Sequence, residues 1–309
     1  MIPVNSVLQV GLFPEVMQAV IDQRVSAVHL LDTGSQVPPG PFESILIRSN
    51  TKLPIKLLEQ LPHIRMVATC GVGYDNLPLE YLKQKGIKAS NTPGVLNDAV
   101  CELAIGMLFG LLRHIPEAHQ FVKTGAWSKG LFRVATTLAG KRVGIAGMGR
   151  IGQDLAKRLE PFKVKLAYTG PTQKEVPYEY FGDIQSLAKA SDILILACPA
   201  SPETDKMINA EVLEALGPKG YLINIARGSV VDEAALLVAL QQKMIAGAAL
   251  DVFENEPNPN VGFLNIDNVL LTPHIGSATS ETRQLMTNLA IDNLEAFYNK
   301  KPLLTEVKN

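Results

Sequence analysis

The segment Arg142-Val-Gly-Ile-Ala-Gly-Met-Gly-Arg-Ile-Gly152 is the strongest indication of how this chain folds. Its first half is a short apolar run typical of a buried parallel strand. Its second half has the pattern GxGxxG, with glycines at Gly147, Gly149 and Gly152, and opens a stretch whose apolar residues recur at helical spacing. A strand, a glycine turn and a helix in this order indicate a dinucleotide-binding unit. The turn lets the backbone approach a pyrophosphate, and the helix N-terminus offers it free N–H groups.

Short apolar runs alternate with amphipathic stretches on both sides of this turn. The alternation predicts an α/β fold with two lobes, each built on a parallel sheet. In the first lobe the expected strands are Ser6 to Val10, Val25 to Leu31, Ser44 to Arg48 and Ile64 to Thr69. In the second lobe the expected strands are Val143 to Gly147, Val164 to Thr169, Asp192 to Ala197, Tyr221 to Ala226, Ala246 to Val252 and Asn268 to Thr272.

Two helices are expected where the chain passes between the lobes. Apolar residues at helical spacing predict one long helix from Asn97 to about Lys123. A second helix, Ser280 to Tyr298, is expected to return the chain to the first lobe. Its expected apolar stripe consists of Leu285, Leu289, Leu294 and Phe297. The predicted domains are therefore residues 1–97 with 281–309, and residues 98–280.

The composition is that of an ordinary globular protein. The chain has 29 basic and 30 acidic residues and a net charge of −1, so we expect neither nucleic acid nor a membrane as a partner. No basic and apolar leader opens the chain, which favours a cytoplasmic protein. Cys70, Cys101 and Cys198 lack CxxC spacing, and we expect buried thiols rather than disulfides or a zinc site.

The end of the second strand of the dinucleotide unit bears on the choice of cofactor. NAD-binding units usually place a carboxylate there to accept from the ribose 2′-hydroxyl. Residues 167–174 contain no carboxylate, whereas Thr169, Thr172 and Lys174 could supply hydroxyls and one positive charge to a 2′-phosphate. The sequence therefore favours NADP(H), with NAD(H) as the alternative. The alternative interpretation of Lys174 is a solvated loop lysine.

Three polar residues follow successive strands of the second lobe: Arg227, Glu256 and His274. The carboxyl ends of parallel strands share one edge of a sheet, so all three are expected near the dinucleotide. An arginine can grip a carboxylate with two hydrogen bonds, and a histidine held by a carboxylate is a suitable proton donor. Taken singly, the three could be an interdomain ion pair, a solvated acid and a turn histidine. The remaining histidines lack metal-ligand spacing, and no metal is expected.

The sequence resembles the D-2-hydroxyacid dehydrogenase family, in particular its NADP-preferring glyoxylate/hydroxypyruvate reductases and hydroxyphenylpyruvate reductases. The matching motifs follow the family's order: Gly71-Val-Gly-Tyr-Asp-Asn76, Asn91-Thr-Pro-Gly94, Val143-Gly-Ile-Ala-Gly-Met-Gly-Arg-Ile-Gly152, Asn224-Ile-Ala-Arg-Gly228, Leu250-Asp-Val-Phe-Glu-Asn-Glu-Pro257 and Thr272-Pro-His-Ile-Gly-Ser277. The resemblance implies two Rossmann/flavodoxin-like lobes, with doubly wound parallel sheets and a cleft between them. The first domain would bind substrate and the second the dinucleotide. One departure is that Gly170 and Pro171 stand where NADP-using relatives commonly have an arginine.

The resemblance also implies roles for individual residues. Arg227 would bind the substrate carboxylate and carbonyl, His274 would donate the proton, and Glu256 would hold His274. Val72 and Gly73 would offer backbone N–H groups to the substrate carboxylate. The cofactor-binding residues would be Gly147, Met148, Gly149, Arg150, Ile151, Gly152, Thr169, Gly170, Lys174, Pro199, Ile225, Asp251 and Gly276, with Asp251 on the nicotinamide carboxamide. Candidate walls of the substrate pocket are Arg48, Ser49 and Tyr74, for which ordinary packing is the alternative.

The implied activity is the reduction of a small 2-oxo acid, similar to glyoxylate or hydroxypyruvate, to the D-2-hydroxy acid with NADPH or NADH. A homodimer joined through the nucleotide-binding domain is implied as well. Phe132 is a candidate to reach the neighbouring subunit's active site, and its alternative is ordinary packing. Two other functions stay open: a dinucleotide-sensing binding protein similar to transcriptional corepressors, and an enzyme similar to phosphoglycerate dehydrogenase.

Overall fold

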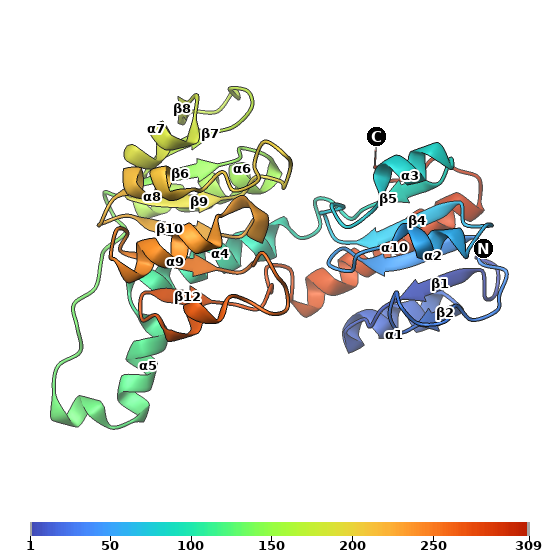
Figure 1. Cartoon of the computed structure of the whole chain (residues 1–309), viewed down its shortest axis with the longest axis horizontal. Coiled ribbons are helices and arrows are strands. Elements are labelled where there is room, and N and C mark those ends of the chain that lie inside the picture. The colour runs from blue at the N-terminus through green and yellow to red at the C-terminus, as the bar shows by residue number, and fades with distance from the viewer. Residues whose placement is uncertain (1, 308–309) are drawn as a thin grey trace. The chain divides into compact units, whose positions relative to one another are not determined.

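The computed structural model describes residues 2–307 and divides into two compact units (Figure 1). Unit 1 contains the described residues up to Leu96 and those from Ala278 onward, and unit 2 runs from Asn97 to Ser277. The predicted domain boundaries follow residues 97 and 280, whereas the observed boundaries follow residues 96 and 277. Each unit has its own parallel sheet, as predicted.

Unit 1 has a five-stranded parallel sheet in the order β2-β1-β3-β4-β5. Its strands are β1 (Val7–Val10), β2 (Ala27–Leu30), β3 (Ser44–Arg48), β4 (Met66–Cys70) and β5 (Lys88–Ser90), and its helices are α1 (Glu15–Arg24), α2 (Ile55–Glu59), α3 (Leu79–Gln84) and α10 (Ser280–Tyr298). This is the doubly wound order of flavodoxin-like sheets. The three-residue strand β5 was not predicted, because so short a run has no periodicity to detect.

Successive residues of the unit 1 strands pack into two cores on opposite faces of the sheet. Leu46 and Met66 face α1 and α10. Ile45 and Val67, one residue away on the same strands, face α2 and α3. Both faces are therefore covered, which is why these strands are continuous apolar runs rather than alternating ones.

Unit 2 has a seven-stranded parallel sheet in the order β12-β11-β10-β9-β6-β7-β8. Its strands are β6 (Arg142–Ala146), β7 (Lys165–Thr169), β8 (Glu179–Phe181), β9 (Ile193–Leu196), β10 (Tyr221–Asn224), β11 (Gly247–Leu250) and β12 (Val269–Leu271). Helices α7 (Ile184–Lys189), α8 (Ala210–Leu216) and α9 (Glu233–Gln241) cover one face, and α4 (Asn97–Leu112) and α6 (Arg150–Leu159) cover the other. The strand order reverses between β6 and β9, which is where such sheets bind ligands. The six predicted strands are confirmed within a few residues, and β8 was missed.

The predicted long helix from Asn97 to Lys123 is wrong, because it is two helices. Helix α4 ends at Leu112, and α5 (Ile115–Lys123) follows after a bend of 60°. His114 adopts a left-handed φ of 54°, and Pro116 occupies the first turn of α5, where its missing N–H is tolerated. Within residues 2–307 no single helix is long and apolar enough to cross a membrane, although the bent pair passes that test together.

Helix α10 has the predicted bounds, but its buried face differs from the predicted stripe. Leu285 is 53% exposed, and the buried apolar side chains are those of Met286, Ala290, Ile291, Leu294 and Ala296. The buried face also carries polar side chains, and these are satisfied. Asn293 donates to the Leu289 carbonyl at 2.8 Å and to the Thr305 hydroxyl at 2.8 Å. Counting apolar residues alone missed this face, because hydrogen-bonded polar residues form part of it.

Candidate active site

The glycine turn after β6 has three distinct steric environments. Gly147 has a left-handed φ of 102°, and a Cβ there would lie 2.7 Å from the Cα of Cys198. A Cβ on Gly152 would lie 2.0 Å from the Gly147 carbonyl oxygen, so Gly152 allows α6 to pack closely on the turn. A Cβ on Gly149 would meet no atom within 4 Å. Gly147 and Gly152 are required by the fold itself, whereas Gly149 faces open space.

The first turn of α6 has the properties of an anion site. Gly149 is its N-cap and provides no side chain to bind the first N–H groups. These N–H groups have no partner within an α-helix, and the positive end of the helix dipole lies beside them. The residues present therefore fit a dinucleotide pyrophosphate, which needs a close backbone approach and several N–H donors.

The end of β7 lies next to this turn, because β6 and β7 pair in parallel. Thr169 is buried, and the Gly170 carbonyl accepts a hydrogen bond from the Tyr180 hydroxyl at 3.1 Å. The backbone of Lys174 is held by the Tyr168 hydroxyl, which accepts from its N–H at 2.8 Å. The Lys174 side chain is exposed and makes no ion pair within the described part of the chain. It therefore provides a positive charge on an anchored loop.

The other expected cofactor residues of unit 2 all lie after the carboxyl ends of its strands. Pro199 follows β9, Ile225 follows β10, Asp251 follows β11 and Gly276 follows β12. Cys198, expected to be buried, is partly exposed beside the glycine turn. Cys70 and Cys101 are buried, as predicted.

Arg227 is placed by the turn that follows β10. The Asn224 side chain shapes this turn, since it donates to the Arg227 carbonyl at 3.0 Å and accepts from the Ala226 N–H at 3.0 Å. A Cβ on Gly228 would lie 1.9 Å from the carbonyl carbon of Phe253. Only glycine at this position lets the Arg227 turn approach the loop that carries Glu256.

Glu256 and His274 form a hydrogen-bonded pair, with 2.6 Å between Glu256 Oε2 and His274 Nδ1. The other Glu256 oxygen accepts from the Phe253 N–H at 3.1 Å. Burial opposes ionisation of Glu256. The hydrogen bond and charge of His274, the Phe253 N–H and the charge of Arg227 outweigh that cost, so the pKa of Glu256 lies below its ordinary value. Arg227, Glu256 and His274 follow the carboxyl ends of β10, β11 and β12, and the charge of Arg227 reaches Glu256.

The pair is accessible to a small molecule. The side chains of His274 and Glu256 are 35% and 28% exposed. Within residues 2–307 the Nε2 atom of His274 makes no hydrogen bond, whereas Nδ1 is occupied by Glu256. A histidine in this arrangement can hold a proton on Nδ1 and exchange another at Nε2.

Asp251 anchors the turn that presents His274. It is 2% exposed and accepts from the Thr272 hydroxyl at 2.6 Å and from the N–H groups of Ile275 and Gly276, each at 2.8 Å. These bonds join the end of β11 to both sides of His274. The left-handed φ of His274, 52°, is held by this framework.

Glu233 supports the loop that carries Glu256, although it was not predicted as a site residue. It is 6% exposed, and its Oε1 accepts from the Glu254 N–H at 2.7 Å. Burial raises the pKa of Glu233, and the nearby charge of Glu254 adds to that effect. In the sequence it looks like an ordinary acidic residue in the first turn of a helix, since Asp232 caps α9 just before it. Only its burial distinguishes it.

Val72 and Gly73 belong to unit 1, in the loop after β4. The Val72 carbonyl accepts from the Asn91 side chain at 2.7 Å, which fixes the loop. Among the residues that the structure describes, no acceptor is bonded to the N–H groups of Val72 and Gly73. These N–H groups are therefore available to an anion.

Comparison with known proteins places the chain in a family. A family model described as "D-isomer specific 2-hydroxyacid dehydrogenase, NAD binding domain" matches residues 105–276. A hydroxyphenylpyruvate reductase of Plectranthus scutellarioides is 45% identical over 267 residues, 86% of this chain and 85% of the relative. A glyoxylate/hydroxypyruvate reductase of Arabidopsis thaliana is 45% identical over 253 residues, 82% of this chain and 81% of the relative.

Solved structures agree with this assignment. The NADPH-dependent glyoxylate/hydroxypyruvate reductase of Sinorhizobium meliloti, in complex with NADP and malonate, is 40% identical and superposes with a TM-score of 0.92. The match covers 97% of this chain and 96% of that one. The predicted fold class and family resemblance are therefore confirmed.

Proposed function

This chain belongs to the D-isomer specific 2-hydroxyacid dehydrogenase family and is a nicotinamide-dependent oxidoreductase, and on that premise we propose that it reduces a small 2-oxo acid to the D-2-hydroxy acid. The proposed substrates are similar to glyoxylate and hydroxypyruvate. Relatives with 40–45% identity are named as reductases of these acids. The observation that carries the proposal is the Glu256–His274 pair, whose hydrogen bond is 2.6 Å long. The charge of Arg227 helps to lower the pKa of Glu256, and the pair lies at the same sheet edge as the glycine turn.

His274 is proposed as the proton donor. Glu256 stays ionised because its pKa is lowered, and it accepts the Nδ1 hydrogen bond. This fixes the ring orientation, so that Nε2 is the nitrogen that can deliver a proton to the substrate carbonyl oxygen. Reduction consumes this proton, so it is favoured at lower pH.

Arg227 is proposed to bind the substrate carboxylate and to polarise the adjacent carbonyl. A guanidinium has parallel N–H groups that match a carboxylate, and it stabilises negative charge on the carbonyl oxygen as reduction proceeds. Val72 and Gly73 are proposed to donate backbone hydrogen bonds to the same carboxylate. When bound, the nicotinamide cofactor supplies the hydride.

The residues proposed to hold the cofactor are those of the glycine turn, Gly147 to Gly152, and those after the remaining strands. NADP(H) is proposed as the preferred form, because no carboxylate in residues 167–174 would repel a 2′-phosphate. Thr169 and Lys174 lie at the strand end where that phosphate would bind. The S. meliloti relative is described as NADPH-dependent, which supports this preference.

The test is the loss of NADPH absorbance on addition of glyoxylate or hydroxypyruvate, with NADH measured in parallel. We expect turnover with both acids and a higher kcat/KM with NADPH. Cofactor binding without turnover across a panel of 2-oxo acids would refute the enzyme assignment and favour a dinucleotide-sensing protein. A higher kcat/KM with NADH would refute the cofactor preference alone.

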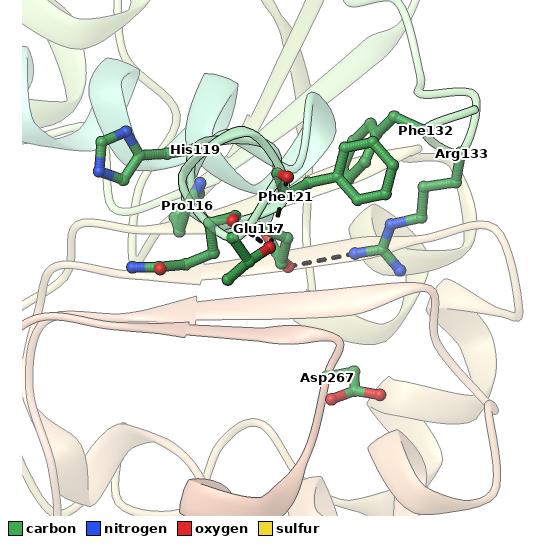
Figure 2. A pocket seen from close by; sticks show the side chains of 9 residues that line it. Pro116, Glu117, His119, Phe121, Phe132, Arg133 and Asp267 are labelled. Atoms are coloured by element: carbon green, nitrogen blue, oxygen red, sulfur yellow. Dashed lines mark hydrogen bonds and ion pairs between the residues drawn. The ribbon is translucent and has the colours of Figure 1, made fainter. Parts of the chain in front are cut away.

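We also propose that unit 2 forms a homodimer through α5 and the segment after it, residues 115–134. This segment exposes large apolar side chains: Ile115, Val122, Trp127, Leu131 and Val134. Exposed apolar side chains concentrated on one segment are typical of an interface, which supports the proposal. The ring centroids of Phe121 and Phe132 lie 5.3 Å apart and Arg133 pairs with Glu117 at 3.1 Å, so contacts within the segment hold it in place (Figure 2). Sedimentation analysis of the full chain and of Leu131→Glu tests this: the variant should be monomeric.

A further inference from the structure

Two arginines of unit 1 lie close together at the carboxyl edge of its sheet. Arg48 is the last residue of β3 and pairs in register with Cys70, the last residue of β4. Arg283 is in the first turn of α10, which packs against β4. The charges of both arginines act on the thiol of Cys70, and both side chains are partly buried.

No carboxylate in the described part of the chain balances the positive charge of this pair. Within residues 2–307 neither Arg48 nor Arg283 forms an ion pair, and the only side-chain hydrogen bond is from Arg48 to the Leu12 carbonyl at 3.4 Å. Burial raises the pKa of the Cys70 thiol to about 12, so it stays neutral. Burial also lowers the pKa of both arginines, and the charge of Arg48 lowers that of Arg283 further.

Arg24 shows how the same unit treats an arginine with a structural role. Its guanidinium pairs with Asp292 at 2.8 Å and Glu295 at 3.0 Å, both on α10. Burial would lower the pKa of Arg24, but these two carboxylates raise it above its ordinary value. The contrast matters because half-buried like charges without a counter-charge are costly unless an anion joins them.

The arginine pair and the free N–H groups of Val72 and Gly73 lie at the same edge of the unit 1 sheet. The loop with these N–H groups starts directly after Cys70. Gly71 is the point at which these two regions approach each other. A Cβ on Gly71 would lie 1.9 Å from the hydroxyl oxygen of Ser49, which is the residue after Arg48. One edge of unit 1 therefore offers two neighbouring sets of anion donors.

We propose that Arg48 and Arg283 form a subsite for a second anionic group, carried by the side chain of the 2-oxo acid. This inference rests on the proposed function, in which the first carboxylate binds at Val72 and Gly73 and at Arg227. The preferred substrate class is then a 2-oxo acid with a second carboxylate or a phosphate, and glyoxylate is a minimal substrate that leaves the subsite unused.

The experiment compares two dianionic substrates, oxaloacetate and 3-phosphohydroxypyruvate, with glyoxylate and with hydroxypyruvate, whose side chain is neutral. In the unaltered protein, kcat/KM for one or both dianions should exceed that for hydroxypyruvate. In Arg48→Gln and in Arg283→Gln, the ratio of dianion to glyoxylate kcat/KM should fall roughly 10- to 100-fold, the loss expected for a hydrogen bond to a charged group. Arg48→Lys keeps the charge and should recover part of the ratio.

The matched control is Arg65→Gln, which removes an exposed arginine at the opposite edge of the same sheet, just before β4. It should leave the ratio unchanged. A response to oxaloacetate alone or to 3-phosphohydroxypyruvate alone would identify the anion as a carboxylate or a phosphate. Unchanged ratios in both arginine variants, with glyoxylate turnover intact in the unaltered protein, would overturn the subsite while leaving the proposed function standing. No turnover of any 2-oxo acid would instead refute the proposed function.

Discussion

Replacing Gly149 by alanine should separate cofactor binding from folding. The Gly149 backbone has φ −80°, which alanine adopts without strain, and its Cβ would meet no atom within 4 Å. Loss of a flexible glycine stabilises a protein by about 0.4–1 kcal/mol through the unfolded chain. Alanine is a poorer N-cap than glycine by about 1 kcal/mol. The two effects nearly cancel, so Tm should stay within about 4 °C of the original.

The same substitution should weaken NADPH binding strongly. The added methyl group stands in the open space through which a pyrophosphate would approach the N–H groups of α6. Loss of one hydrogen bond to a charged group costs about 1.5–3 kcal/mol, which corresponds to a rise in Kd of roughly 10- to 100-fold. Titration of NADPH fluorescence measures this Kd, and thermal unfolding without cofactor measures Tm.

Gly152→Ala is the matched comparison. Its Cβ would lie 2.0 Å from the Gly147 carbonyl oxygen, so α6 must move away from the turn. Overpacking of this kind costs about 1–3 kcal/mol, which lowers Tm by several degrees. The reasoning would be refuted if Gly149→Ala bound NADPH with an unchanged Kd, or if it lost as much thermal stability as Gly152→Ala.

Three further predictions concern the groups around the Glu256–His274 pair. His274→Ala should lower kcat by roughly 10²- to 10⁴-fold, and Arg227→Ala should abolish 2-oxo acid turnover. Both should still bind NADPH in the fluorescence titration, and near-normal kcat in His274→Ala would disprove the proton-donor role. The raised pKa of Glu233 means that the folded state binds its proton more tightly than the unfolded state. The charged form of Glu233 therefore lowers the stability of the fold at neutral pH, and this loss disappears as the pH falls below the ordinary pKa of 4.5. Glu233→Gln keeps an acceptor for the Glu254 N–H and should therefore raise Tm at neutral pH but not below about pH 4; an equal effect at both pH values would contradict the assignment.

The α/β fold, the glycine turn and the three strand-end residues could be predicted from the amino-acid sequence. Those features depend on local chemistry, since a buried strand needs an apolar run and a tight turn near a phosphate needs glycine. Arg227, Glu256 and His274 could be expected together because parallel strands present their carboxyl ends at one edge. The helix break at His114 was missed, because the apolar spacing continues across it and outweighed the signal of Pro116.

Which charged groups have partners could be learned only from the packing of the folded chain. Glu233 and Arg48 look like ordinary acidic and basic residues in the sequence, and neither local spacing nor composition reveals that one is buried under the Glu254 backbone and the other lies beside Arg283. The reason is physical: the free energy of a charge depends on its burial and on neighbours that are distant along the chain, and packing alone brings those neighbours together.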